Sequence, residues 1–212
     1  MIKEFCAENY TDLEKAIHQG IDRIELCDAL AVGGTTPSYG VIEQSVRLAK
    51  QHKVEVVVMI RPRQGGFCYT EMERKIMERD IDVALRLGAT GVVFGCLTKE
   101  NTIDVPLMKQ LVDEVNNRGE IIFHMAFDQI TPKEKYQAID QLIALNVTRV
   151  LLHGSDPNQS VEGNAEEIND YIRYADHNID FIVGGGVTAD NLAGLKSIVN
   201  TNQFHGTKII KL

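Results

Sequence analysis

The chain has 212 residues, of which 44% are hydrophobic and 25% are charged, and its formal net charge is −8. This length and composition are typical of a single globular domain that can bury a full α/β core. The negative net charge argues against nonspecific binding to nucleic acid or to an anionic membrane, although individual basic residues could still hold a small anion.

Neither a membrane anchor nor a secretion signal is expected. No apolar run approaches the roughly 18 to 20 residues that a membrane helix needs, and the first ten residues, MIKEFCAENY, lack the apolar segment of a signal peptide. The four cysteines lie far apart and form no CxxC pair, which favours reduced thiols over a disulfide framework. We therefore expect a cytosolic protein that binds neither nucleic acid nor a membrane.

Short apolar runs that predict β-strands alternate with amphipathic segments from one end of the chain to the other. The first amphipathic segment shows the pattern, because Leu13, Ala16 and Ile17 recur at helical spacing. Ser38 and the pair Thr131-Pro132 are typical of helix starts, and so is the segment 188–190. The predicted strands are Ile2–Cys6, Arg23–Cys27, Glu55–Ile60, Gly91–Phe94, Ile121–His124, Arg149–Leu152, Asp180–Val183 and Gln203–His205.

This alternation predicts a parallel sheet covered by helices. Eight strand–helix units close most naturally into a TIM-type (β/α)8 barrel, and we expect residues 1–212 to form it as one domain; an open doubly wound sheet is the alternative. Only seven residues follow His205, too few for an eighth covering helix. Apolar surface would then lie open over the last and first strands, which predicts a homodimer or a higher homo-oligomer.

The second predicted strand carries the most informative residue, Glu25. Side chains alternate along a strand, so if Ile24 and Leu26 pack under helices, Glu25 and Cys27 face the barrel interior. An unpaired carboxylate there is costly, and Arg61 or Arg63 could pair with it. Glu25 is then either part of a structural ion pair or a functional acid/base group or metal ligand.

Two thiols end neighbouring strands. Cys6 and Cys27 would lie close together, because adjacent parallel strands are only about 4.8 Å apart. Thiolates suit a soft ion such as Cu(I), and Met59 and Met125 could contribute thioethers. The alternative is that these cysteines and methionines are ordinary core residues.

Further candidates lie at other strand ends. His124 and Asp128 could orient one another in an acid/base or hard-metal site, although a core histidine explains His124 nearly as well. Gly185 and Gly186 would let the backbone approach an anion, as in barrel phosphate sites, but a tight turn accounts for them almost equally well. The chain contains no nucleophile elbow, P-loop or dinucleotide fingerprint, so no organic cofactor is predicted.

Six motifs, spread over essentially the whole chain, resemble those of the CutC family of copper homeostasis proteins: ELCDALAVGGTTPSYG, MIRPRQGGFCY, GVVFGCLT, FHMAFD, IVGGGVTADN and FHGTK. The resemblance implies a TIM-type barrel, a cytoplasmic location and a link to copper through Cu(I) binding. It places the metal-binding cysteines at Cys6, Cys27 and Cys96. Residues at the barrel mouth would be Glu25, Arg61, Arg63, His124 and Asp128. Met125 stands where the family motif is expected to have arginine.

Two functions follow from these observations. The favoured hypothesis is a copper homeostasis protein that buffers or traffics Cu(I) through cysteine thiolates. The alternative is an enzyme that acts on a small anionic metabolite, with copper effects being indirect. In that case Arg61, Arg63, Gly185 and Gly186 would bind the anion, while Glu25, His124 and Asp128 would transfer protons.

Overall fold

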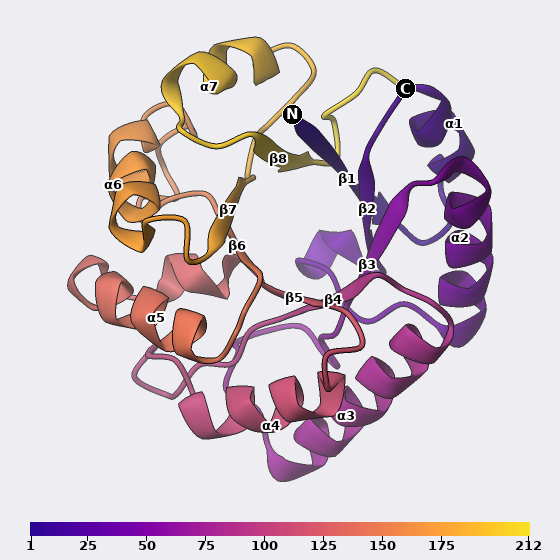
Figure 1. Cartoon of the computed structure of the whole chain (residues 1–212), viewed down its shortest axis with the longest axis horizontal. Coiled ribbons are helices and arrows are strands. Elements are labelled where there is room, and N and C mark those ends of the chain that lie inside the picture. Colours follow the sequence, from indigo (N-terminus) through magenta and orange to yellow (C-terminus); the bar gives the residue numbers. More distant parts are fainter.

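The computed structural model describes residues 1–212 and contains a closed barrel of eight parallel strands in the order β1 to β8. Figure 1 looks into this barrel, with the helices arranged around it. The fold confirms the predicted TIM-type barrel and excludes the open sheet. The strands are β1 (Ile2–Glu8), β2 (Arg23–Cys27), β3 (Glu55–Met59), β4 (Gly91–Phe94), β5 (Glu120–Phe123), β6 (Arg149–Leu152), β7 (Asp180–Val183) and β8 (Gln203–Gly206).

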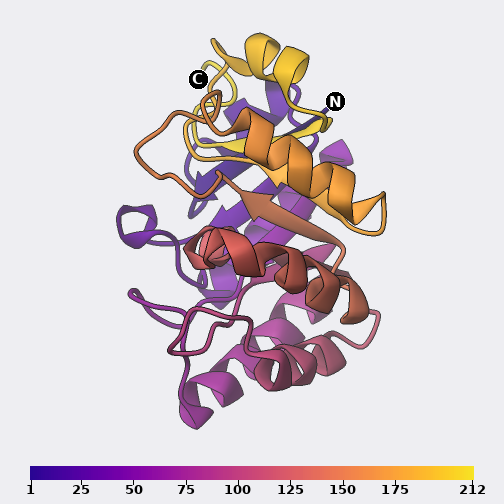
Figure 2. The same cartoon turned by 90° about the vertical axis from the view of Figure 1, so that its left-hand side faces the viewer.

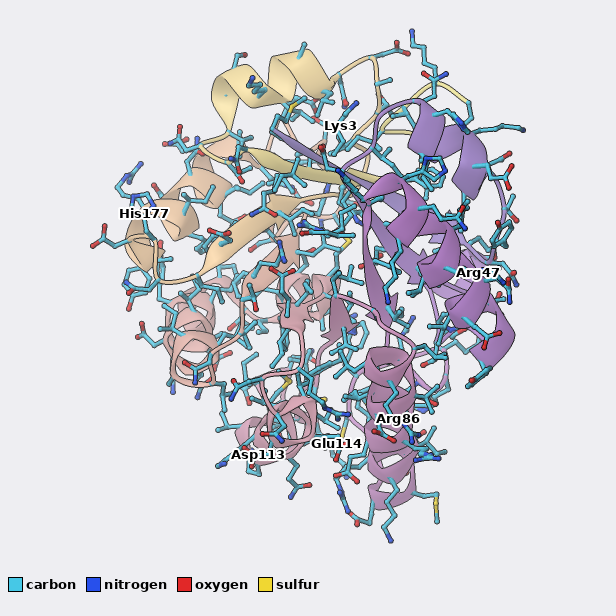
Figure 3. The ribbon with its side chains drawn as sticks, turned by 45° about the vertical axis from the view of Figure 1, so that its right-hand side comes forward. Lys3, Arg47, Arg86, Asp113, Glu114 and His177 are labelled. Carbon is cyan, nitrogen blue, oxygen red and sulfur yellow. The ribbon has the colours of Figure 1, made fainter.

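Seven α-helices and two 3₁₀ turns connect the strands, and Figure 2 shows the helices packed along the outside. Charged side chains such as Arg47 and Arg86 project from their outer faces (Figure 3). No helix is both long enough and apolar enough to cross a membrane. The helices are α1 (Leu13–His18), α2 (Tyr39–His52), α3 (Glu71–Arg86), α4 (Val105–Val115), α5 (Pro132–Ala144), α6 (Ala165–Ala175) and α7 (Leu192–Ile198); the 3₁₀ turns are η1 (Leu30–Val32) and η2 (Met125–Gln129).

Two of the three predicted helix starts are confirmed. The Ser38 hydroxyl accepts a hydrogen bond from the backbone N–H of Val41, and α5 begins at Pro132 directly after Thr131. The third helix, α7, begins only at Leu192. Thr188 instead holds the preceding turn, because its hydroxyl accepts from the backbone N–H of Asn191.

The chain ends without an eighth helix, as predicted, but its tail covers much of the gap. Ile209 and Ile210 are 1% and 8% exposed and join the same core cluster as Phe5 of β1 and Phe204 of β8. A backbone bridge between Thr188 and Lys208 attaches the tail to the loop after β7. The expected open apolar surface is therefore largely absent. Self-association stays a prediction and loses this support.

The barrel interior is charged at its amino-terminal end. Arg23 forms an ion pair with Glu4, and Arg149 forms one with Glu120. The Gln203 side-chain oxygen accepts hydrogen bonds from both arginines, at 2.9 and 3.2 Å. Buried charges are tolerated only when they are paired in this way. This network fills the base of the barrel and leaves the carboxyl-terminal end, here called the mouth, for a site.

Candidate functional site

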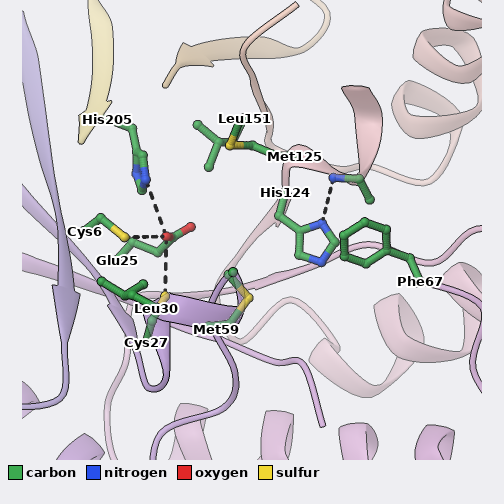
Figure 4. Close-up of a pocket in the computed structure, with 12 residues that line it drawn as sticks. Cys6, Glu25, Cys27, Leu30, Met59, Phe67, His124, Met125, Leu151 and His205 are labelled. Carbon is green, nitrogen blue, oxygen red and sulfur yellow. Dashed lines mark hydrogen bonds and ion pairs between the residues drawn. The ribbon is translucent and has the colours of Figure 1, made fainter. Parts of the chain in front are cut away.

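A pocket of about 200 Å³ lies at the mouth and is drawn in Figure 4; we call it the mouth pocket. Six strands contribute to its wall, either with a residue of the strand or with the residue that follows it: β1, β2, β3, β5, β6 and β8. The pocket therefore forms only when the barrel closes. Most of its wall is apolar, and its polar groups are few, as is usual for a small-molecule site. It is lined by Cys6, Glu25, Cys27, Leu30, Gly33, Met59, Phe67, His124, Met125, Ala126, Leu151 and His205.

Glu25 is the centre of the polar wall. It faces the interior as predicted and is 2% exposed. Its Oε2 accepts hydrogen bonds from the Cys6 and Cys27 thiols, both at 3.5 Å, and lies 3.7 Å from His205 Nε2. Its Oε1 has no partner. The register explains this, because Cys6 stands directly opposite Glu25 and Cys27 follows two residues later on the same face.

Burial and neighbouring charges set the protonation of these three groups. Burial raises the pKa of Glu25 to about 8, with the negative charges of Cys6 and Glu4 adding to the effect against the opposing cation of His205. The hydrogen bond from Cys27 lowers the pKa of Cys6 well below its usual value. The same bond, followed by burial, raises the pKa of Cys27. Cys6 is therefore the more acidic thiol of the pair, and Cys27 the less acidic one.

His205 and Glu4 complete the polar wall from inside the barrel. His205 Nδ1 lies 2.8 Å from Glu4 Oε1, and the other Glu4 oxygen pairs with Arg23. Burial opposes a charged imidazole, but the surrounding Glu25, Cys6 and Glu4 raise the pKa of His205 well above its usual value. Burial likewise opposes an ionised Glu4, but the His205 hydrogen bond and the Arg23 charge lower its pKa to about 2.

The sequence placed His205 at a strand end, among the titratable groups expected at the mouth, but suggested no role for it. Glu4 was not assigned to the site, although a signal for it was present. Period-two alternation places Glu4 on the same face of β1 as Cys6, and hence inside the barrel. The predicted pairing of Glu25 with Arg61 or Arg63 is wrong. The partners of Glu25 are the two thiols and His205.

Both arginines hold loops, although Arg61 Nε is buried without a partner. The Arg61 guanidinium donates to the backbone carbonyls of Val32, Gly34 and Gly65. Arg63 pairs with Glu73 and also donates to loop carbonyls. Neither residue lines the mouth pocket. The structure thus shows both residues holding the loops after β2 and β3, and the anion-binding role expected from the sequence stays a prediction.

His124 lines the pocket, but it does not contact Asp128 as predicted. Its Nδ1 accepts a hydrogen bond from the backbone N–H of Ala126 at 3.2 Å. Burial, and then the Arg61 charge, lower the pKa of His124 to about 3. Asp128 instead accepts from the backbone N–H groups of His153 and Gly154, and burial raises its pKa to about 6. The two side chains thus have separate roles, and Asp128 anchors the loop after β6.

The structure does not bring Cys96 to the other two candidate cysteines. Cys96 is fully buried in the outer core, whereas Cys6 and Cys27 belong to the small cluster inside the barrel. The expected three-cysteine set is therefore corrected to a pair. Gly185 and Gly186 line a second hollow of about 420 Å³, which shares Met125 and His205 with the mouth pocket.

Comparison with known proteins assigns the chain to a family. The sequence matches the model of the CutC family over residues 1–210. The CutC family protein of Enterococcus faecalis is 43% identical over 210 residues, and that of Streptococcus pyogenes is 46% identical over 210 residues. Each alignment covers 99% of this chain and 100% of the relative.

Solved structures agree with this assignment. The crystal structure of CutC from Streptococcus agalactiae matches with a TM-score of 0.96 and 44% identity, covering 99% of this chain and 100% of that one. Deoxyribose phosphate aldolase from Aeropyrum pernix matches with a TM-score of 0.72 at 11% identity, covering 99% and 86%, which shows a shared barrel fold alone. By sequence over its whole length and by structure, the chain belongs to the CutC family.

Proposed function

We propose that this protein serves copper homeostasis by binding Cu(I) at the barrel mouth through the thiolates of Cys6 and Cys27. The observation that carries the proposal is the position of the two sulfur atoms, which lie with a Glu25 oxygen within 4.8 Å of one another. Two metal–sulfur bonds of about 2.3 Å span up to about 4.6 Å. An ion could therefore bridge the two sulfurs with little movement of the strands.

The chemistry of the donors supports a soft ion. Thiolates and thioethers prefer Cu(I), and Met59 and Met125 line the same pocket as the two cysteines. The lowered pKa of Cys6, caused first by its hydrogen bond from Cys27, makes this thiol the easier of the two to deprotonate when an ion binds. Cys27 would lose its proton to the influence of the bound cation. A cytosolic location suits this site, because thiols remain reduced there.

An anaerobic Cu(I) competition titration against a chelator tests the proposal. Wild-type protein should bind tightly at a fixed stoichiometry, and Cys6→Ser and Cys27→Ser should each lose that binding. Cys96→Ser is the matched control, since Cys96 is equally buried but lies in the outer core. Weak wild-type binding, or binding that none of these substitutions changes, would contradict the proposal.

A second candidate function is acid/base catalysis on a small anionic metabolite. It is favoured by the Glu25–His205 pair, in which a carboxyl group with a raised pKa and a histidine cation meet at a pocket wall. Perturbed groups in a cleft are typical of catalytic sites. Turnover of anionic metabolites by the wild type, abolished in Glu25→Gln, would support an enzyme. Cu(I) binding that survives in Glu25→Gln would show that copper and catalysis are separable.

A further inference from the structure

Two hollows adjoin at the mouth. The mouth pocket holds about 200 Å³, and the second hollow, here called the glycine pocket, holds about 420 Å³. They share Met125 and His205 as wall residues, so they are neighbours at the same mouth. A metal ion would leave most of this space empty, because even a water molecule takes only about 30 Å³. The glycine pocket is lined by Met125, Gly185, Gly186, Val187, Thr188, His205, Gly206, Thr207 and Lys208.

The mouth pocket contains an unpaired polar atom. Glu25 Oε1 is buried and has no hydrogen-bond partner, and Figure 4 shows it turned away from the thiols and His205, toward the opposite wall. A buried polar atom without a partner costs about 1–3 kcal/mol and is rare in native proteins. A ligand hydroxyl would satisfy it in either protonation state of Glu25, because a hydroxyl both donates and accepts.

His124 provides a second unpaired group on the pocket wall. A backbone N–H can only donate, so the bond from Ala126 fixes Nδ1 as an acceptor and places the ring proton on Nε2. That buried Nε2–H has no partner. It needs an acceptor such as a hydroxyl or carbonyl oxygen. The mouth pocket therefore suits the oxygenated end of a small organic molecule, with Met59, Phe67 and Leu151 packing against its carbon atoms.

The glycine pocket suits an anion. Gly185 and Gly186 have φ values of +78° and +103°, and a Cβ at Gly186 would meet nothing within 4 Å, so bare backbone faces open space. Successive backbone N–H groups in such conformations form anion-binding concavities. Lys208 adds a cation at the rim. In TIM barrels the loops after strands seven and eight are where phosphate groups frequently bind.

We propose that the two pockets form one binding site for a small phosphate monoester that carries a hydroxyl or carbonyl group. The phosphate lies in the glycine pocket beside Lys208, and the organic part enters the mouth pocket, with its oxygen between Glu25 and His124. This inference rests on the second candidate function and extends it by naming the class of substrate. Lys208 would supply the cation for the anion, because the Arg61 and Arg63 guanidiniums are held by loop carbonyls or Glu73.

Calorimetric titration with inorganic phosphate, without copper, tests the phosphate half of the site. Lys208→Ala should weaken phosphate binding about tenfold, the equivalent of about 1.4 kcal/mol. Lys211→Ala is the matched control, since Lys211 lies three residues further along the same tail and pairs with Asp190. Undetectable binding of millimolar phosphate to the wild type, or equal weakening in both variants, would overturn the proposal.

Two probes test the organic half. Glycerol 3-phosphate should bind more tightly than methyl phosphate, which lacks a hydroxyl, and Glu25→Gln should reduce this difference. If Glu25→Gln does not fold, Leu30→Phe, at a half-buried wall position, should reduce the difference by filling the pocket. Equal affinity of the two esters for the wild type would overturn the proposal. Tight ester binding without any turnover would contradict the enzyme but leave the binding site standing.

Discussion

His205 Nδ1 lies 2.8 Å from Glu4 Oε1, although the two residues are 201 positions apart in the sequence. The contact joins the last strand of the barrel to the first. The other ring nitrogen of His205 lies 3.7 Å from Glu25. One imidazole therefore lies between two buried carboxyl groups. The contact that joins the last strand to the first thus also affects the charge of Glu25 at the mouth.

Replacing Glu4 should destabilise the protein in a pH-dependent way. The His205 hydrogen bond and the Arg23 charge outweigh burial and lower the pKa of Glu4 from 4.5 to about 2. A lowered carboxyl pKa contributes stability that is complete above the unfolded value of 4.5 and is lost as the pH falls toward 2. Glu4→Gln should thus reduce the free energy of unfolding by roughly 3 kcal/mol at pH 7, from about 1.4 kcal/mol per pKa unit.

Urea unfolding of both proteins between pH 7 and pH 2 measures this effect. The difference between wild type and Glu4→Gln should shrink as the pH falls below 4.5. Glu14→Gln on α1 is the control, since Glu14 is exposed, and it should stay within about 0.5 kcal/mol of wild type. A difference that is constant with pH would show that Glu4 acts through packing rather than through its charge.

The two pocket thiols should react differently with a small alkylating reagent. The thiolate is the nucleophile, and the hydrogen bond from Cys27 lowers the pKa of Cys6, whereas the pKa of Cys27 is raised by that bond and by burial. Iodoacetamide should therefore modify Cys6 before Cys27 at the same pH. Mass spectrometry of digested samples locates the modified residue.

The other two cysteines provide a fast and a slow reference for these reaction rates. Cys68 is exposed and should react at once, and Cys96, fully buried with a pKa raised by burial, should react last. Substituting Cys68 by serine beforehand removes the fast background. Modification of Cys27 before Cys6 would contradict this order of acidity.

His124 should remain neutral at ordinary pH. Burial and the Arg61 charge lower its pKa to about 3, and Ala126 fixes its Nδ1 as the acceptor. In ¹⁵N NMR spectra His124 should show the Nε2–H tautomer without titrating between pH 8 and pH 5. The lowered pKa means that His124 binds a proton more readily in the unfolded chain than in the folded protein. The free energy of unfolding should therefore decrease as the pH falls from 6.5 toward 3. A midpoint near pH 6.5 would contradict the buried environment.

The sequence predicted those parts of the site that depend on local spacing and on neighbouring strands. Alternation along β2 placed Glu25 and Cys27 inside the barrel, and the parallel pairing of β1 with β2 brought Cys6 beside them. His205 belongs to β8, which is separated from β2 by β1. Its contact with Glu25 crosses the barrel interior, and strand periodicity does not encode which interior side chains meet there.

Loop conformation explains why the structure differs from the sequence prediction at Arg61, at Arg63 and in the tail after His205. Arg61 and Arg63 follow a strand end, as mouth residues do, but the glycine-rich loops offer carbonyls that capture both guanidiniums. The tail after His205 was too short for a helix, yet two isoleucines in it cover much of the gap. Such outcomes depend on backbone paths that have no regular period, and so pattern reasoning does not reach them.

Gly95, which follows β4, should be essential for the position of His124. A Cβ at Gly95 would lie 2.7 Å from both Cε1 and Nδ1 of the His124 ring, closer than side-chain atoms pack. Gly95→Ala should displace the ring, break its bond with the Ala126 N–H and lower the free energy of unfolding by about 1–3 kcal/mol. Gly194→Ala is the matched control: it lies in α7 with nothing within 4 Å, and should raise stability by up to about 1 kcal/mol. Chemical denaturation measures both changes in stability, and the ¹⁵N signal of His124 shows whether its ring has moved.

A Gly95→Ala variant with wild-type stability and an unshifted His124 signal would contradict this prediction. It would show that the wall of the mouth pocket can adjust, and that Gly95 does not set the position of His124.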